Sequence, residues 1–318
     1  MGVKNLNKFL QTRCDDTTRC ISLSNFKDKT IVVDINVYLY RFKEENELLG
    51  KVYLMCSVFS KHNITPIFVF DGNSPHIKSA EKKRRSAAKK TAESKYIELN
   101  ARAQLETNII LREHMDEELQ ILKKQFVRIT KEDSESVKNM IRACGMTYIV
   151  ADGESDDVCG YLCVTGQADA CLSEDTDMFV YGCPCILKHI SLTNETAWYY
   201  NYTDILSSLK LSDKLFKQLC ILSGTDYNLY RKCSASTIFT YYKNMFYFEK
   251  SNIDDLFQYI CDSESDLKKC EEIYTIYDVT ASEHADKYAQ YNEIPKQVTL
   301  CNKEQIRSLL TPENFYFV

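Results

Sequence analysis

Seven acidic residues stand directly after short apolar runs or in short acidic clusters, and this arrangement constrains the fold more than any other feature. A β-branched or aromatic run that ends at a polar residue, such as residues 30–33 before Asp34, is typical of a buried parallel strand. Ligands of open α/β sheets bind outside the carboxyl ends of such strands, so we expect the carboxylates to converge there. Converging carboxylates repel one another unless cations lie between them, and oxygen ligands favour Mg²⁺ or Mn²⁺. The seven residues are Asp34, Asp71, Glu154, Asp156, Asp175, Asp177 and Asp226.

The order of strand and helix signals predicts the fold class. These signals alternate through about residue 190, which indicates an α/β fold with a mainly parallel twisted sheet flanked by helices. Residues 78–128 contain no Gly or Pro and are rich in Ala, Glu, Lys and Leu, so we expect one or two long helices there. Beyond about residue 203 the pattern is helical. We predict one domain over 1–318, with a helical insertion at 78–130 and a helical region at 205–318.

Several local expectations accompany this fold. Gly50 is expected to separate two helices, and residues 178–200 are expected to form short strands. Asp133 or Ser134 is expected to cap a helix that Gly145 ends. Asp175 and Asp177 stand two apart in a stretch expected to be extended, which would direct both side chains to one side.

Each acidic pair also has a plainer interpretation. Asp175 and Asp177 could belong to a polar turn, and Glu154 and Asp156 could be the acidic first turn of a helix. For either pair taken alone, the plainer interpretation is favoured over a metal site. Acidic residues at five strand-associated positions in one chain favour a shared site instead.

The charge distribution is uneven along the chain. The net charge is −5, yet the stretch from residue 78 to 102 carries nine basic and three acidic residues. A charge run is most often a solvated helix face, and the Lys82–Arg85 run also resembles a nuclear localisation signal. Because it follows the strand that carries Asp71, we favour a positive helix beside a metal centre, which suits a phosphate held between them. The basic residues are Lys78, Lys82, Lys83, Arg84, Arg85, Lys89, Lys90, Lys95 and Arg102.

Fourteen cysteines are scattered through apolar patterns, and we expect reduced thiols in an intracellular protein. No secretory or membrane-spanning run is expected, and the choice between nucleus and cytoplasm stays open. Cys183, Cys185 and His189 raise the possibility of zinc, but a second ligand pair at zinc-finger spacing is missing, so we do not predict a zinc site.

Six short blocks together resemble the flap endonuclease/XPG family of structure-specific 5′ nucleases. The resemblance covers residues 1 to about 230, and the ordered set of blocks is specific to that family. The blocks are MGVKNL at residues 1–6, VDINVYLY at 33–40, FDGNSP at 70–75, ADGESD at 151–156, SEDTD at 173–177 and LSGTDY at 222–227.

The resemblance implies roles for individual residues. The seven acidic residues would hold two Mg²⁺ (or Mn²⁺) ions, and Lys78 and Arg85 would be the catalytic cations of the gateway helix. Gly2 would approach the DNA, Tyr40 would stack on a flipped base, and residues 78–130 would form a helical arch. The cations Lys82, Lys83 and Arg84 are expected to bind DNA.

The chain also departs from the family pattern, which indicates a divergent member; a viral source is one interpretation. Asp156 stands where the family has Glu, and no glycine follows Gly224, so the helix-turn-helix DNA-binding element is degenerate. We predict that Arg231 and Lys232 contact duplex phosphates instead, and that potassium is not specifically required. No sliding-clamp-binding peptide is evident in the sequence.

The predicted function is a metal-dependent 5′ nuclease that cleaves flap or branched DNA as an endonuclease and 5′–3′ exonuclease during replication, repair or recombination. Two metals would activate the attacking water and stabilise the leaving oxygen. Two alternatives stay open: a non-catalytic protein that binds DNA junctions, and a Holliday-junction resolvase or ribonuclease with the same fold. Cleavage assays on labelled substrates distinguish them.

Overall fold

A seven-stranded mixed sheet forms the centre of the computed structural model, which describes residues 2–72, 79–231, 233–249, 254–294 and 300–311. The strand order is β1-β7-β6-β5-β2-β3-β4. Strands β4, β3, β2, β5 and β6 run parallel, and β7 pairs antiparallel with both β6 and β1. The strands are β1 (Thr18–Ser22), β2 (Thr30–Asp34), β3 (Thr65–Phe70), β4 (Thr147–Val150), β5 (Ala170–Leu172), β6 (Cys185–Ser191) and β7 (Thr196–Asn201). The predicted fold class is confirmed.

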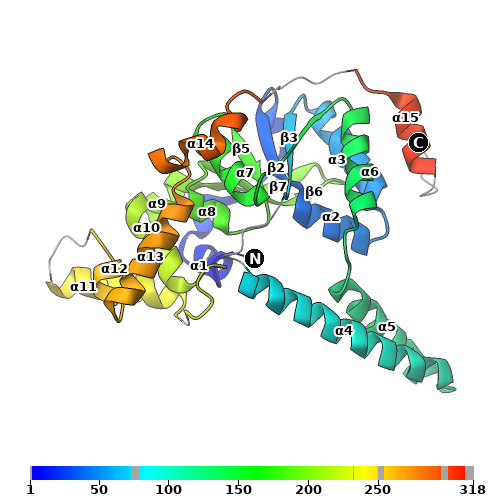
Figure 1. Cartoon of the computed structure of the whole chain (residues 1–318), viewed down its shortest axis with the longest axis horizontal. Helices are drawn as coiled ribbons and strands as arrows, with labels where there is room; N and C mark the ends of the chain where they lie inside the picture. The colour runs from blue at the N-terminus through cyan, green and yellow to red at the C-terminus, as the bar shows by residue number, and fades with distance from the viewer. Residues whose placement is uncertain (1, 73–78, 232, 250–253, 295–299, 312–318) are drawn as a thin grey trace.

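Helices cover both faces of this sheet, and each face has its own apolar core (Figure 1). Alternate side chains of β2 serve the two cores, since Val32 packs in one and Val33 in the other, both fully buried. The first face carries α1 (Leu6–Arg13), α7 (Ser155–Val164), α8 (Asp177–Tyr181), α9 (Tyr202–Leu209), α10 (Asp213–Ser223), α11 (Ala235–Glu249) and α13 (Glu264–Tyr277). The second carries α2 (Ile35–Glu44), α3 (Leu48–Lys61), α6 (Lys131–Ala143) and α15 (Lys303–Leu310).

Smaller helices complete the C-terminal and connecting regions. They are α12 (Phe257–Ile260), α14 (Ala285–Tyr288) and the short 3₁₀ helices η1 (Asp15–Thr17), η2 (Leu23–Phe26), η4 (Ser282–His284) and η5 (Ala289–Tyr291). None of the helices in the described ranges is both long enough and apolar enough to span a membrane. From residue 205 onward, the described residues form helices joined by turns and loops, and none of them belongs to a strand.

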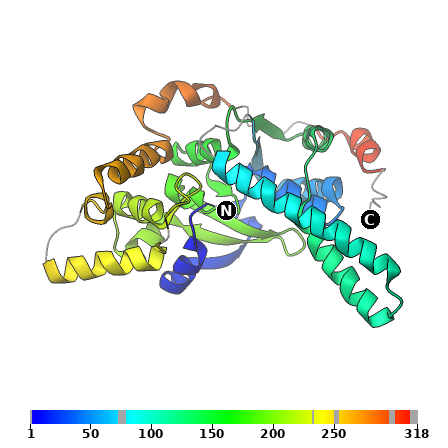
Figure 2. The same cartoon turned by 60° about the horizontal axis from the view of Figure 1, so that its bottom comes forward.

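Two long antiparallel helices, α4 (Ser79–Leu105) and α5 (Ile109–Gln125), project from the body as a hairpin (Figures 1 and 2). The side chain of Asn108 caps α5 by accepting hydrogen bonds from the backbone amides of Ile110 and Leu111. The absence of Gly and Pro in this stretch correctly indicated long helices. In Figure 2 the beginning of α4 lies beside the N-terminus of the chain, at the centre of the molecule.

Several local expectations were wrong. Gly50 lies inside α3 rather than between two helices, and residues 177–181 form α8 rather than a strand. Helix α6 is capped by Thr130, whose hydroxyl accepts from the amide of Asp133 while the Asp133 carboxylate accepts from the amide of Thr130. Thr130 stands one turn before Asp133, which was one of the two caps that we expected and which serves instead as the partner of Thr130 in this capping box.

Candidate metal and DNA site

The sequence-predicted acidic residues lie at the carboxyl edge of the parallel strands and in the loops next to it. Asp34 ends β2, and Asp71 directly follows β3. Glu154 is the N-cap of α7, and Asp156 lies in its first turn, as expected. The remaining residues are Asp175 in the loop after β5, Asp177 at the start of α8, and Asp226 in the loop after α10.

One serine hydroxyl joins the first two acidic residues. Oγ of Ser155 lies 2.9 Å from Oδ1 of Asp34 and 2.9 Å from Oδ1 of Asp71, and its amide donates to the same Asp71 oxygen. A hydroxyl donates one proton, so Ser155 serves one carboxylate at a time. The second contact is satisfied when a carboxyl carries a proton or when a cation screens the pair. Ser155 therefore ties two predicted metal ligands together.

Asp34 is buried and holds an unfavourable charge. Burial and the negative charge of Asp71 raise the pKa of Asp34 from 3.8 to about 7. The hydroxyls of Ser155 and Ser173 donate to its two oxygens at 2.9 and 3.0 Å and oppose this rise. The structure thus concentrates negative charge that its own donors do not fully offset.

Asp175 and Asp177 converge through a helix start, not through an extended strand. Thr176 has helical backbone angles, and the amide of Asp177 donates to Oδ1 of Asp175 at 3.0 Å. Our expectation of an extended stretch was therefore wrong, although the two side chains do lie together. Both residues are buried, and Tyr277 at the end of α13 donates its hydroxyl proton to Oδ2 of Asp177 at 2.8 Å.

The backbone of Gly2 lies directly against this acidic pair. A Cβ atom at Gly2 would lie 2.1 Å from Oδ1 of Asp175 and 2.5 Å from Oδ1 of Asp177, and the φ angle of +77° also favours glycine. The N-terminal segment is held on both sides, because Thr176 donates to the carbonyl of Val3 and the amide of Lys4 donates to the carbonyl of Gly224. Only glycine leaves the space beside the carboxylates open.

Arg85 on α4 reaches the last acidic residue. Its guanidinium donates to Oδ2 of Asp226 at 2.9 Å, which joins the projecting hairpin to the acidic site. A cavity of ≈ 450 Å³ opens beside this pair and is lined by four cationic residues, Lys4, Arg84, Arg85 and Arg231. A cationic cavity next to an acidic cluster fits a phosphate group adjoining bound metal ions.

The predicted base-stacking residue already has a cationic neighbour. Nζ of Lys89 lies 4.4 Å from the ring centroid of Tyr40, whose side chain is partly exposed on α2. Lys83 and Arg84 are exposed on α4, so both can meet a nucleic acid there. Nothing in the described residues bears on the side chain of Lys82, and the predictions for Lys78 and Lys232 fall outside them.

Arg231 has an acidic partner within the protein. Its side chain is 9% exposed, and its guanidinium donates to Asp266 on α13 at 2.5 Å, within the protein. Half-buried Asp266 therefore holds the guanidinium, although Arg231 also lines the cavity beside Arg85, and the prediction that Arg231 contacts duplex phosphates stays a prediction. The prediction about potassium stays a prediction.

The sequence analysis missed the residues that hold the acidic side chains in place. Ser155, Ser173 and Tyr277 donate to them, and buried Lys188 donates to the carbonyl of Glu174 at 2.9 Å, beneath the acidic pair. Asn228 fixes the loop of Asp226 by accepting from Thr225 and donating to the carbonyl of Ile221. Ser155 and Ser173 stand beside predicted ligands, which was the available signal; Tyr277, Lys188 and Asn228 had none.

Comparisons with known proteins agree with this geometry. Residues 1–92 match the XPG N-terminal domain, and residues 145–226 match the XPG I-region. Flap endonuclease 1 of Yarrowia lipolytica is 26% identical over 247 residues, which cover 71% of this chain and 63% of that protein. Flap endonuclease 1 of Mus musculus is 25% identical over 245 residues, which cover 71% of this chain and 61% of that protein. The chain thus spans less than two thirds of the length of these relatives.

Solved structures share the fold. The catalytic core of Rad2 in complex with a DNA substrate superposes with a TM-score of 0.58 at 18% identity, over 98% of this chain and 95% of that one. Human GEN1 in complex with Holliday junction DNA gives a TM-score of 0.61 at 16% identity, over 99% and 74% of the two chains. The fold and its acidic edge define the structural class of the 5′ nucleases. Within that class, the chain belongs to the flap endonuclease/XPG family.

Proposed function

We propose that this protein is a divalent-metal-dependent, structure-specific 5′ nuclease that hydrolyses phosphodiester bonds in flap or branched DNA during replication, repair or recombination. One observation carries the proposal: buried Asp175 and Asp177 lie against Gly2, which also lines the cavity with cationic side chains, and Ser155 joins Asp34 to Asp71 at the same edge of the sheet. An acidic turn with only a structural role would not require an adjoining cavity that a ligand can enter.

The donor set fits Mg²⁺ or Mn²⁺. All predicted ligands are carboxylate oxygens, which hard divalent cations prefer. The raised pKa of Asp34 and the close approach of Asp34 and Asp71 to one hydroxyl indicate negative charge that a cation would offset. We propose that two ions bind among Asp34, Asp71, Glu154, Asp156, Asp175, Asp177 and Asp226. When bound, they would supply an activated water and neutralise charge on the phosphate.

The protein's own side chains orient the reacting groups. Ser155 and Ser173 hold Asp34 from two sides, and Tyr277 holds Asp177, so the carboxylates keep fixed positions. Arg85 lies beside Asp226 at the mouth of the cationic cavity, where it can stabilise charge that develops on the transferring phosphate. We therefore assign Arg85 a role in the chemical step.

The same surface provides a path for the DNA strand. Lys4 and Arg84 line the cavity beside Arg85, and Lys83 continues the positive charge along α4. We propose that a single strand passes between the α4–α5 hairpin, acting as an arch, and the acidic edge of the sheet, and that Tyr40 stacks on a base once Lys89 moves off its ring. Lys78 and Lys82 would add to this charge.

The relatives support the choice of substrate class. The related proteins are flap endonuclease 1, the Rad2 core bound to a DNA substrate, and GEN1 bound to Holliday junction DNA or to product DNA with Mg²⁺. The names and bound molecules of these proteins include a DNA flap and a Holliday junction, and we extend that class of substrate to this chain. We also propose that it works inside the cell, where DNA of this kind occurs.

A panel of labelled substrates tests the proposal. Flap, nicked, gapped, Holliday-junction and RNA substrates are incubated with the protein and Mg²⁺, with EDTA as the control. We expect Mg²⁺-dependent cleavage of the flap near its junction, with a weaker effect on RNA. Tight binding of every branched DNA without cleavage would favour a junction-binding protein, and preferred symmetric cleavage of the Holliday junction would favour a resolvase.

A further inference from the structure

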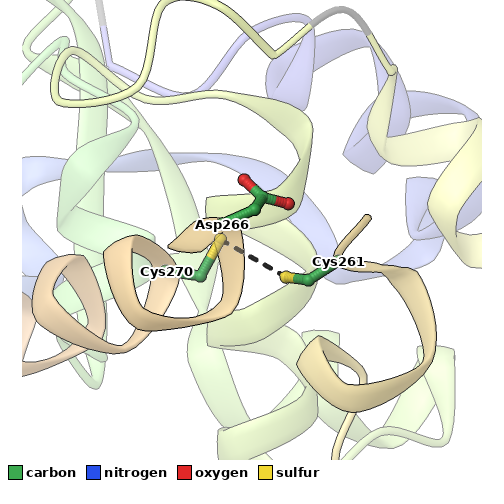
Figure 3. Close-up of side chains that lie close together, drawn as sticks. All are labelled: Cys261, Asp266 and Cys270. Atoms are coloured by element: carbon green, nitrogen blue, oxygen red, sulfur yellow. Dashed lines mark hydrogen bonds between the residues drawn. The ribbon is translucent and has the colours of Figure 1, made fainter. Parts of the chain in front are cut away.

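A pair of thiols lies in the C-terminal helical region, apart from the acidic site. Sγ of Cys261, which directly follows α12, lies 3.8 Å from Sγ of Cys270 on α13 (Figure 3). A disulfide needs about 2.05 Å between the sulfurs, so rotation of one side chain closes much of the remaining gap. Both thiols are free in the structure.

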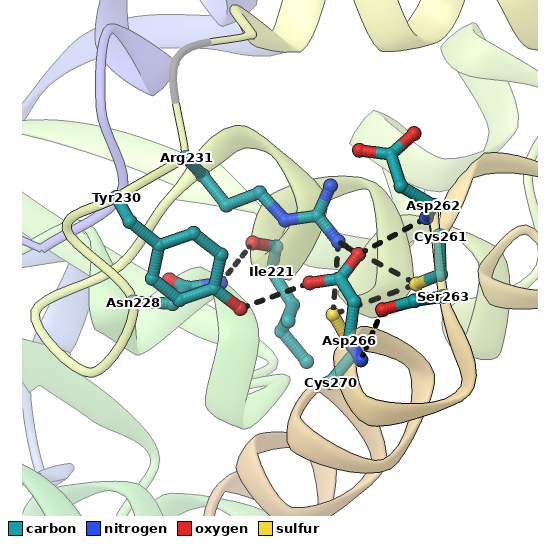
Figure 4. Close-up of polar contacts among 9 residues, drawn as sticks. All are labelled: Ile221, Asn228, Tyr230, Arg231, Cys261, Asp262, Ser263, Asp266 and Cys270. Atoms are coloured by element: carbon teal, nitrogen blue, oxygen red, sulfur yellow. Dashed lines mark hydrogen bonds and ion pairs between the residues drawn. The ribbon is translucent and has the colours of Figure 1, made fainter.

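The guanidinium of Arg231 lies among these groups (Figure 4). Its Nη2 lies 3.3 Å from Sγ of Cys270, 3.5 Å from Sγ of Cys261 and 2.5 Å from Oδ2 of Asp266. Tyr230 donates its hydroxyl proton to the other Asp266 oxygen at 3.0 Å. A fixed cation beside two thiols stabilises the thiolate form that disulfide chemistry requires.

The two sulfurs differ in their access to solvent. Cys261 is half-buried, whereas Cys270 is fully buried. A small reagent can therefore meet Cys261 first, and Cys270 is placed to react in a second step. Burial and the neighbouring Cys270 raise the pKa of Cys261 to about 12, and Arg231 opposes that rise. The resting groups are therefore two thiols, and we expect slow exchange with an added oxidant through the small thiolate fraction that Arg231 stabilises.

Cys261, Asp266 and Cys270 also have the composition of a metal site, because one ligand atom of each lies within 4.8 Å of the others. A zinc ion would need to lie about 2.3 Å from each sulfur and about 2.0–2.2 Å from the carboxylate. Nη2 of Arg231 already occupies the space between these atoms, and a second cation there would meet its positive charge. The arrangement therefore favours thiol oxidation over metal binding.

We propose that Cys261 and Cys270 form a modification site that a low-molecular-weight disulfide converts to an intramolecular disulfide. The thiolate of Cys261 attacks one sulfur of the reagent, forms a mixed disulfide and releases one reagent thiolate. The thiolate of Cys270 then attacks the Cys261 sulfur and releases the second reagent thiolate. Two protein thiols are oxidised, one reagent disulfide is reduced to two thiols, and the two protein protons go to solvent or to the released thiolates.

The test treats the folded full chain with oxidised glutathione, blocks the remaining thiols with iodoacetamide and maps peptides by mass spectrometry. We expect a peptide that links Cys261 to Cys270 and that disappears after reduction. The exposed Cys20 and Cys233 serve as internal controls, since glutathione adducts can form there. Nuclease activity is not needed for this measurement, so the result is independent of the proposed function.

Two variants separate the steps. Cys270→Ser should retain glutathione on Cys261, because the resolving thiol is missing, and Cys261→Ser should abolish the link without an adduct on buried Cys270. Wild-type mapping decides the matter alone if either variant fails to fold. Adducts on Cys20 and Cys233 without any Cys261–Cys270 link in the wild type would overturn the proposal. So would a stoichiometric zinc ion, measured in the untreated protein, that both substitutions remove.

Discussion

The guanidinium of Arg85 donates a hydrogen bond of 2.9 Å to the carboxylate of Asp226. These residues lie 141 positions apart, one on the projecting helix α4 and the other in the loop after α10. The contact brings a predicted catalytic cation to a predicted metal ligand. It also makes α4 part of the acidic site, so a substitution in the hairpin can change the geometry of that site directly.

Arg85→Ala should slow the chemical step far more than it weakens DNA binding. Loss of one preorganised charge at the transferring phosphate costs about 3 kcal/mol, which is on the order of a hundredfold in rate. Single-turnover cleavage of a labelled flap measures the rate, and binding in Ca²⁺ measures the affinity. Lys83→Ala is the matched control on an exposed position of the same helix, and it should change affinity and salt dependence but not the rate at saturation. Equal, modest binding defects in both variants would mean that this run of charge is only a solvated face.

Tyr277→Phe should impair cleavage although Tyr277 lies outside the predicted ligand set. The substitution removes the proton that the hydroxyl donates to buried Asp177, and loss of a partner of this kind typically lowers metal affinity or activity by about 10–100-fold. The measurement is the single-turnover rate as a function of Mg²⁺ concentration. Tyr274→Phe removes a hydroxyl from the same helix, where the ring packs edge-on against Phe257, and should leave the rate near that of the wild type. If both variants behave alike, Tyr277 does not position the site.

The stability of the protein without divalent metal should depend on pH through Asp34. Its pKa is raised to about 7 by burial and by Asp71, so the folded state binds this proton more tightly than the unfolded state. The contribution is present in full below the unfolded pKa and is lost as pH rises through the folded pKa. We therefore expect the Tm in EDTA to fall by several degrees between about pH 5 and about pH 8.

Asp34→Asn is the control for this pH dependence, since an amide does not titrate. The difference in Tm between wild type and variant should change over that pH range in EDTA and should change less in Mg²⁺. A constant difference across the range would contradict the assignment of an uncompensated charge at Asp34.

Arg231→Ala should destabilise the fold rather than weaken DNA binding. It leaves half-buried Asp266 without its cationic partner, and we expect a loss between the about 1 kcal/mol of an exposed pair and the about 3–5 kcal/mol of a fully buried pair. Denaturant unfolding measures this loss, and Lys268→Ala, at an exposed position on the same helix, should have little effect. A flattened salt dependence of DNA binding with unchanged stability would instead support the prediction that Arg231 contacts phosphates.

The sequence predicted the features that depend on local patterns. The apolar runs before Asp34 and Asp71 are strands β2 and β3, and the stretch without Gly or Pro is the α4–α5 hairpin. Parallel strands share a direction, so acidic residues at their carboxyl ends lie at one edge of the sheet. The fold class therefore predicted where the acidic site lies. The family resemblance rested on the same blocks.

Other features depended on contacts between distant segments. Arg231 turns inward because Asp266, 35 residues later, lies within reach, and no pattern around Arg231 signals that partner. Likewise, Tyr277 meets Asp177 across 100 residues, through the packing of α13 against α10. We predicted that the side chains of Asp175 and Asp177 lie together, but not that a helix start brings them together. Helix α8 has 5 residues, which is too short for a periodic apolar pattern to reveal.

The central claim is that the acidic edge of the sheet is a catalytic metal centre. The most direct measurement is single-turnover cleavage of a labelled 5′ flap by the wild type and by Asp177→Asn across a Mg²⁺ titration, with flap binding measured in parallel. We predict that the variant loses cleavage at every Mg²⁺ concentration while it binds the flap as well as the wild type or better, since removing a carboxylate relieves repulsion of DNA phosphates. Wild-type turnover by Asp177→Asn at millimolar Mg²⁺ would contradict the claim.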